Sequence, residues 1–211
     1  MEKTKLVAFT FDDGPLPYAE DSTAMRILKT YEKCGQQATF FYWGERINDV
    51  SAPEMKFAQS IGCEAGNHTF THRPLTEKTV EEMKEELGNA AEAIEKVLGE
   101  APKLMRLPYL ASNDTVIATV DYPMINCSAD SRDWDNASAE DIIQTMLDLD
   151  AAGELENAII LMHETYATTA AAVEYLLPAL MEKGYRFVTV SELAKQNGVE
   201  PEKHKIYGKF L

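Results

Sequence analysis

The sequence predicts an α/β fold, a single-domain distorted (β/α)7 barrel that is TIM-barrel-like, with its functional site at the C-terminal ends of the strands. Two observations indicate this fold. Short apolar runs alternate with helical patterns along the chain, which is typical of βα units around a parallel sheet. Clusters of polar residues also follow five of these runs. Five strand ends converge at the mouth of a barrel, whereas an open doubly wound sheet brings together only about two or three.

The predicted strands are short runs rich in β-branched and aromatic residues. They span residues 5–11, 38–42, 63–66, 104–107, 123–126, 158–162 and 186–190. The clearest helices are predicted over residues 79–98, 139–149 and 167–183. Thr79 and Glu82 form a capping-box pattern, and Gly99 stands where a helix commonly ends on glycine. Pro178 is expected to kink or break the third of these helices unless tertiary contacts compensate.

Composition limits the classes of partner. The chain has 211 residues and no Pro/Gly/Ser-rich linker, so one domain over residues 1–211 is predicted. A formal charge of −15 argues against nucleic acid and anionic membranes, because both would repel the protein at long range. A neutral or weakly charged substrate suits this charge better, and a monomer is expected.

Localisation stays open from the sequence. No signal peptide is visible, and no apolar run reaches the roughly 18 residues that a membrane span needs. A chain trimmed of its leader would be extracellular. Cys34, Cys63 and Cys127 are odd in number and widely spaced, which favours buried free thiols over a disulfide framework.

Adjacent acids and a pair of histidines form the most informative pattern. Asp12 and Asp13 end the first predicted strand, where a simple turn is the alternative interpretation. His68 and His72 have the i, i+4 spacing that would place both rings on one face of a helical turn. One carboxylate and two imidazoles would complete a divalent metal site with an open position for water, and would leave a second carboxylate as a base.

Three further clusters follow later strands. Arg106 could hold a carboxylate such as Asp12 bidentately, or form a surface ion pair. The 130–134 segment carries two acids and Trp134, which could wall a sugar-sized pocket, although an acidic loop with a core tryptophan is the default. His163 ends a buried apolar run and could be structural or catalytic.

In order and in type, these clusters resemble the motifs of the polysaccharide deacetylase family, also called the NodB-homology or carbohydrate esterase family 4 domain. The matching motifs are TFDDGP at 10–15, H-T-x-x-H at 68–72, R-x-P-Y at 106–109, D-S-x-D-W at 130–134 and L-x-H at 161–163. The resemblance runs from about Lys5 to about Leu193, and the ordered set is highly specific.

The resemblance implies a role for each residue. It makes Asp13, His68 and His72 the ligands of one divalent metal ion. Zn²⁺ is the expected ion from its availability, while Co²⁺ and Ni²⁺ suit the same ligands. Asp12 would be the catalytic base, and Arg106 would orient it.

The remaining roles concern the leaving group and the substrate. His163 would be the general acid, paired with Asp130, and the backbone N–H of Tyr109 would stabilise the oxyanion. Trp134 and Leu161 would line the pocket for the acetyl methyl group.

Two departures from the family pattern stand out. The family usually reads Arg-Pro-Pro-Tyr-Gly in the third motif, whereas Leu107 and Leu110 replace a proline and the glycine here. Loss of that glycine is expected to alter the loop path and the groove. Glu164 follows His163 where the family more often has Asp.

The implied activity is metal-dependent hydrolytic removal of acetyl groups from a polysaccharide or oligosaccharide. The 130–138 and 161–163 stretches most resemble acetylxylan esterase members, which favours O-acetyl xylan. N-deacetylation of GlcNAc-containing glycans, either chitin oligomers or peptidoglycan, is the alternative. A non-catalytic carbohydrate-binding pseudoenzyme and a hydrolase of C–N bonds in small molecules are further hypotheses from other classes.

Overall fold

A parallel sheet built around its longest strand forms the centre of the computed structural model, which describes residues 4–210. β1 (Lys5–Gly14) lies between β2 (Thr39–Tyr42) and β6 (Ile159–His163). The sheet continues to β3 (Glu64–Asn67) on one side and β5 (Ala129–Asp130) on the other, in the order β3-β2-β1-β6-β5. β7 (Tyr185–Phe187) pairs with the start of β1, whereas β2 pairs with its end.

Several strand predictions need correction. Of the run predicted at 104–107, only Met105 pairs, as a bridge to β3 and to β4 (Met124–Ile125). β5 and β8 (Ile206–Tyr207) were not predicted, because two residues carry no readable alternation. The last predicted strand is displaced, since Val190 already begins α7 (Val190–Gln196) behind a Thr189 cap.

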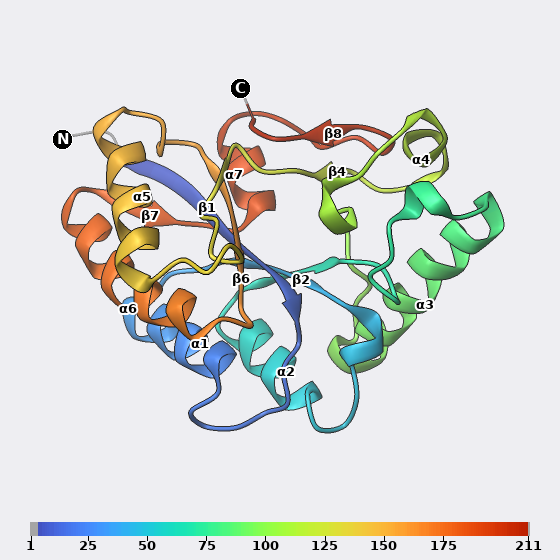
Figure 1. Ribbon diagram of the computed structural model, residues 1–211, viewed down its shortest axis with the longest axis horizontal. Helices are drawn as coiled ribbons and strands as arrows, with labels where there is room; N and C mark the ends of the chain where they lie inside the picture. Colours follow the sequence, from blue (N-terminus) through green and yellow to red (C-terminus); the bar gives the residue numbers. More distant parts are fainter. Residues whose placement is uncertain (1–3, 211) are drawn as a thin grey trace.

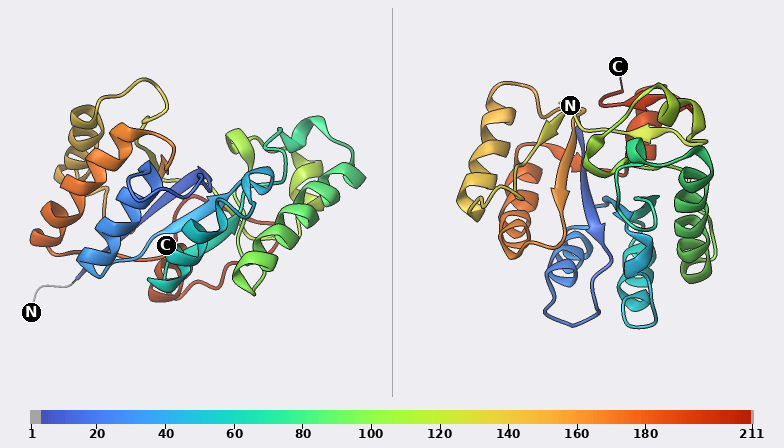
Figure 2. Two further views of the ribbon diagram at one scale, coloured as in Figure 1. Left: turned by 90° about the horizontal axis from the view of Figure 1, so that it is seen from below. Right: turned by 45° about the vertical axis from the view of Figure 1, so that its right-hand side comes forward.

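The helices follow the strand order around the sheet (Figures 1 and 2). Each helix contacts the next in the order α5, α6, α1, α2, α3, α4, which is the ring expected of a βα barrel. The predicted fold class, a distorted TIM-like barrel, is therefore confirmed. The bounds are α1 (Thr23–Cys34), α2 (Ala52–Ser60), α3 (Val80–Leu98), α4 (Asp114–Thr119), α5 (Ala139–Ala151) and α6 (Ala167–Glu182).

Alternation along β1 sets up both the core and the site. Val7, Phe9 and Phe11 point into the main core, where Phe9 packs edge-on against Phe187 and Phe11 stacks on Phe40. Ala8 belongs to a separate core cluster. Because side chains alternate along a strand, Thr10 and Asp12 share the side of Ala8, and both meet Arg106 there.

Local helix predictions fared unequally. The Thr79 capping box and the left-handed Gly99 at the end of α3 are confirmed. Of the two outcomes expected for Pro178, the helix does not break there, because α6 continues through this residue. Its packing against α1 and α5 offsets the missing hydrogen bond. The three cysteines are free, as predicted, but half-buried.

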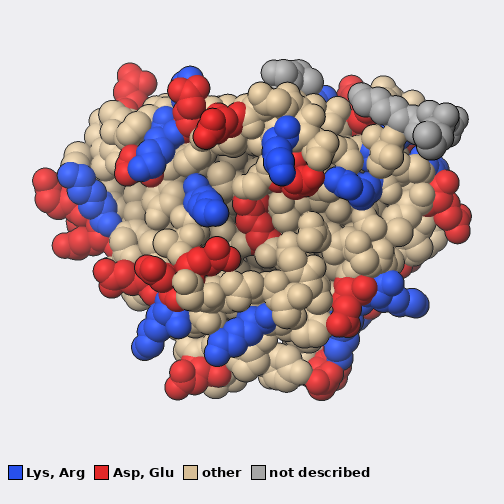
Figure 3. Space-filling model, turned by 180° about the vertical axis from the view of Figure 1, so that it is seen from behind, with Lys and Arg blue, Asp and Glu red and all other residues tan. Residues whose placement is uncertain are grey.

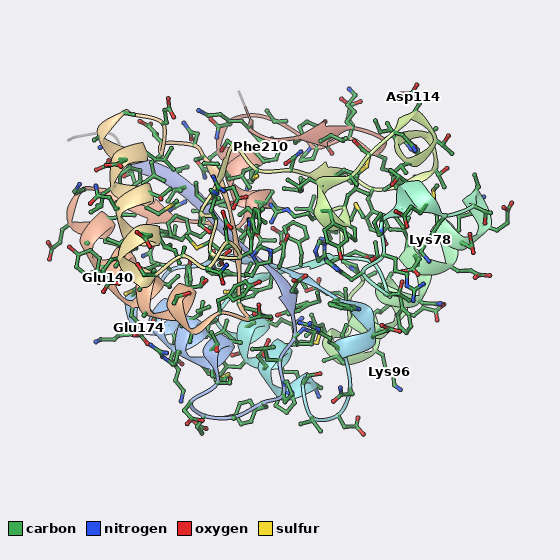
Figure 4. All side chains as sticks on the ribbon, in the orientation of Figure 1. Lys78, Lys96, Asp114, Glu140, Glu174 and Phe210 are labelled. Atoms are coloured by element: carbon green, nitrogen blue, oxygen red, sulfur yellow. The ribbon has the colours of Figure 1, made fainter. Side chains whose placement is uncertain are left out.

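On the face of the molecule shown in Figure 3, Lys and Arg side chains lie among Asp and Glu side chains. Within residues 4–210, none of the helices is long and apolar enough to cross a membrane. Phe210, labelled in Figure 4 near α7, is buried against Tyr207 in the same core cluster as Ala8.

Candidate active site

The end of β1 presents two adjacent carboxylates to one pocket. Neighbouring strand residues normally face opposite sides of a sheet. Here the register with β2 shifts between Asp12 and Gly14, and Asp13 adopts a left-handed conformation with φ 69°. This bulge turns the carboxylate of Asp13 toward the side that Asp12 faces, so both side chains line the same cavity.

The two histidines meet Asp13 through a loop. The expected helical turn is wrong, since residues 68–72 form an irregular segment in which Thr69 and His72 are left-handed. The Nε2 atoms of His68 and His72 lie 3.2 Å apart, and they lie 3.5 Å and 3.1 Å from Asp13 Oδ1. The predicted triad therefore comes together, although by another local route.

The triad fits a tetrahedral divalent ion. Bonds of about 2.0–2.1 Å to such an ion place neighbouring ligand atoms roughly 3.3 Å apart. His68 Nδ1 lies 2.8 Å from the carbonyl oxygen of Arg106, so it donates there and leaves Nε2 free as a ligand. Burial raises the pKa of Asp13, but the neighbouring histidines lower it more, and the net pKa falls well below the ordinary value. Asp13 thus stays ionised.

Two residues that the sequence reasoning missed hold the histidine loop. The side chain of Asn67 accepts a hydrogen bond from the Thr69 N–H and donates to the Leu87 carbonyl. The carboxylate of Glu86 accepts hydrogen bonds from the N–H groups of Phe70 and Thr71, at 3.0 Å and 2.8 Å. An acid on the apolar face of α3 was the signal that could have identified Glu86.

Arg106 lies behind the pocket and is fully buried. Its Nη1 donates to Asp12 Oδ1 at 2.8 Å and to Thr10 Oγ1 at 2.7 Å. Nε and Nη2 donate to backbone carbonyls of Ile125 and Asn126. The expected contact with Asp12 is present, but it uses one nitrogen and is not bidentate.

The partner of His163 is Asp133, and the expected pairing with Asp130 is wrong. His163 Nδ1 lies 2.8 Å from Asp133 Oδ1. Asp130 instead accepts hydrogen bonds from the Arg132 N–H and from Trp134 Nε1. Burial lowers the pKa of His163, but the hydrogen bond to Asp133 and nearby acidic charge raise it more, so the net pKa is raised.

The metal-ligand triad lines one cavity of about 410 Å³ together with Asp12 and His163. Trp134 is half exposed and forms part of its wall, so the default of a core tryptophan is wrong. Tyr166, which the sequence reasoning missed, lies beside His163 with ring centroids 5.7 Å apart. The lining residues are Asp12, Asp13, His68, His72, Leu107, Tyr109, Leu110, Asp130, Trp134, Leu161, His163 and Tyr166.

Comparison with known families settles the relationship. The family model described as polysaccharide deacetylase matches residues 2–123, which is more than half of the chain. The chain belongs to the polysaccharide deacetylase family. The ordered motifs of the sequence and the convergence of their residues on one cavity agree with this membership.

Relatives in this family carry two kinds of name. The chain is 33% identical over 210 residues to a bifunctional xylanase/deacetylase of Pseudobutyrivibrio xylanivorans, covering 98% of this chain and 33% of that protein. It is 33% identical over 190 residues to the peptidoglycan-N-acetylglucosamine deacetylase PgdA of Listeria monocytogenes, covering 90% and 39%. The chain thus spans between a third and two fifths of the length of these two relatives.

Solved structures of the family share the fold. The Xyl-CE4 domain of a multidomain xylanase from the hindgut metagenome of Trinervitermes trinervoides superposes with a TM-score of 0.88 and 32% identity over 98% of both chains. A family 4 acetyl xylan esterase from Clostridium thermocellum, in complex with a cobalt ion, gives a TM-score of 0.86 and 28% identity, covering 97% of this chain and 98% of that one.

A buried acid pair lies directly behind the metal-ligand turn. Glu164, which stands where the family more often has Asp, is fully buried with Glu54 as its neighbour. A Cβ on Gly14 would lie 1.3 Å from Glu164 Oε1, so any side chain there would require the Glu164 carboxyl to move. Burial raises the pKa of Glu54 to about 8, and burial together with Glu54 raises that of Glu164 well above its usual value. Neutral carboxyls therefore support the turn.

Proposed function

We propose that this chain removes acetyl groups from a carbohydrate by metal-dependent hydrolysis. One observation carries the proposal: the Asp13, His68 and His72 triad lines the same cavity as an oriented carboxylate, Asp12, and an oriented imidazole, His163. This is the set that hydrolysis of an acetyl group needs, namely a metal site, a base and an acid.

The metal ligands and the base act on water. A divalent cation held by the triad supplies Lewis acidity, which lowers the pKa of water and stabilises negative charge on oxygen. Asp12 accepts the proton of the attacking water through Oδ2, because Oδ1 is held by Arg106. The buried guanidinium fixes the direction of this carboxylate.

His163 acts on the leaving group. With Nδ1 held by Asp133, its Nε2 carries the proton that passes to the departing alcohol or amine. The backbone N–H of Tyr109 donates to the developing oxyanion, and its left-handed φ of 56° sets that direction. Trp134 and Leu161 receive the acetyl methyl group.

An O-acetylated xylan is the favoured substrate, with Zn²⁺ as the native ion. No Lys or Arg side chain lines the cavity within the described residues, so an anionic glycan finds no basic side chain there. The exposed rings of Tyr109, Trp134 and Tyr166 suit stacking against neutral pyranose rings. The names of the xylanase and acetyl xylan esterase relatives support the same substrate.

N-deacetylation of chitin oligomers or peptidoglycan is the second candidate, because the PgdA relative is as similar in sequence as the xylanase/deacetylase. Acetate release from acetylated xylan, chitin oligomers and peptidoglycan, with and without a chelator, separates the candidates. We expect the highest kcat/KM on acetylated xylan and loss of release with chelator. No acetate from any of the three by metal-loaded protein would leave a pseudoenzyme or a small-molecule hydrolase.

A further inference from the structure

The segment that follows β2 contacts both pieces of chain that supply the metal ligands. The N–H of Trp43 donates to the carbonyl of Gly14, one residue beyond Asp13, at 2.6 Å. The next two N–H groups, of Gly44 and Glu45, each donate at 2.9 Å to the carbonyls of Thr69 and Phe70 in the histidine loop. Residues 43–45 therefore tie the end of β1 to the 68–72 loop.

The side chains of Trp43 and Arg46, which also follow β2, form a stack against the His72 ring. The Trp43 ring stacks on His72 with ring centroids 4.7 Å apart and an interplanar angle of 26°. The guanidinium of Arg46 lies over the Trp43 ring, 4.2 Å from its centroid, in a cation–π contact. Arg46 Nη1 also donates to the carbonyl oxygen of Asp13. Two side chains thus contact one ligand ring and one ligand backbone.

The need for such support differs between the two histidines. His68 is buried, and its Nδ1 is held by the Arg106 carbonyl. His72 is half-buried and left-handed, and its Nδ1 has no hydrogen-bond partner within the described residues. Metal-binding histidines are usually oriented through their second nitrogen. For His72 the aromatic stack takes that place.

The segment itself has little freedom to move. A Cβ on Gly44 would lie 2.6 Å from a ring carbon of Phe70 and 3.0 Å from the Phe70 Cα. The preceding strand β2 is buried along its whole length and paired on both sides. The backbone that carries the Trp43 and Arg46 side chains is therefore held in place.

We propose that Trp43 and Arg46 are positioning residues of the metal site, which hold the His72 ring and the Asp13 backbone in the geometry that binds the cation. Neither side chain lines the catalytic cavity within the described residues. They act through the ligands and leave substrate contacts unchanged. The inference rests on the metal site of the proposed function, and it goes beyond that function by assigning metal affinity to residues outside the ligand set.

Titration of metal-free protein with Co²⁺ tests the role of Trp43 and Arg46 directly, with binding monitored by calorimetry and by visible absorption. We expect Trp43→Ala and Arg46→Met each to weaken Co²⁺ binding by about 10- to 100-fold, the range found when groups that orient ligands are removed. Trp43→Phe retains a stacking ring and should restore most of the affinity. At saturating Co²⁺ the KM for the glycan should equal that of the unmodified protein.

Arg26→Met is the matched control, because Arg26 makes a bidentate surface pair with Glu174 and contacts no ligand. Circular dichroism of the metal-free variants checks folding. If Trp43→Ala does not fold, Arg46→Met decides the question. Unchanged Co²⁺ affinity in folded Trp43→Ala or Arg46→Met, or an equal loss in Arg26→Met, overturns the inference. Absence of Co²⁺ binding by unmodified protein removes the metal site, and with it both this inference and the proposed function.

Discussion

His163 Nδ1 lies 2.8 Å from Oδ1 of Asp133, a carboxylate that is buried beside the cavity. The second oxygen, Oδ2, accepts hydrogen bonds from the His163 N–H and from the Thr169 hydroxyl, both at 2.7 Å. Asp133 is thereby fixed at both oxygens, and it fixes the imidazole in turn. This leaves Nε2 as the ring nitrogen available to a substrate.

Asp133→Asn should lower kcat/KM on the glycan by about 10²- to 10⁴-fold, the usual contribution of a positioned proton donor. The hydrogen bond to Asp133 raises the pKa of His163, so its loss lowers that pKa. A general acid works only while protonated, and the alkaline limb of the pH–rate profile should therefore move to lower pH. Rates measured across the pH range check this.

Asp130→Asn is the matched change three residues earlier. Asp130 bonds to Trp134 Nε1 and to the Arg132 N–H, and it makes no hydrogen bond to His163 within the described residues. We expect an altered KM, because the Trp134 side chain in the cavity wall loses its hydrogen bond to a carboxylate. The alkaline limb of the pH–rate profile should stay where it is in the unmodified protein. A shift of that limb equal to that of Asp133→Asn would contradict the assignment of Asp133.

Asp12→Asn should reduce turnover by about 10²- to 10⁴-fold while the metal stays bound, because the amide oxygen can still accept from Arg106 but cannot take a proton. His68→Ala should lose both metal and turnover, since a ligand is removed. Metal content of the purified variants, measured by atomic emission, distinguishes the two. His68→Ala that binds metal with unchanged affinity would refute the ligand set.

The Glu54 and Glu164 pair should make the protein less stable as pH rises. Both groups bind protons more tightly folded than unfolded, so their contribution is full below about pH 4.5 and is lost progressively toward pH 8. One pKa unit corresponds to about 1.4 kcal/mol, so the change in unfolding free energy is at most several kcal/mol.

Urea unfolding of metal-free protein at pH 5 and pH 8 measures this dependence. Glu54→Gln and Glu164→Gln should each flatten it, while Glu92→Gln, an exposed change on α3, should not. If both buried variants keep the full fall in stability between the two pH values, the neutral acid pair is wrong.

Leu110 occupies the left-handed region, with φ 54°, at the position where the family usually has glycine. Leu110→Gly should keep the unfolding free energy within about 1 kcal/mol of that of the unmodified protein. Glycine relieves backbone strain in the folded state, but it also raises the conformational entropy of the unfolded chain, and the two effects nearly cancel. Leu110→Val should cost roughly 1–3 kcal/mol, since a β-branched side chain fits this conformation poorly. Thermal and urea unfolding compare the two, and equal stability of both variants would contradict the backbone assignment.

The sequence predicted the structure well where local periodicity or a capping pattern determines it. The β1 pattern and the α3 cap followed from residue type and spacing. The choice of Asp13 as the partner of His68 and His72 came from the family resemblance, because residue type alone left Asp12 and Asp13 open. Sequence reasoning failed where loop geometry decides. The left-handed Thr69 and His72 carry no signal in their side chains, and the bulge at Asp13 reverses the alternation expected of a strand.

The choice between Asp130 and Asp133 shows the same limit. Both acids lie in one short segment, and either could have reached His163. A tight turn in which the Asp130 carboxylate caps the Arg132 N–H, with Arg132 left-handed, directs Asp133 inward. The pairing of Glu164 with Glu54 was missed, because the two acids are 110 residues apart in the sequence and meet only in the folded barrel.

Stepwise addition of Zn²⁺ to metal-free protein, with acetate release followed on acetylated xylan and on chitin oligomers, tests the central claim most directly. A metal-dependent deacetylase with one triad should show no release without metal and a rate that rises to a plateau at one equivalent. Undiminished acetate release by the metal-free protein, or none at any equivalent despite bound Zn²⁺, would contradict the account.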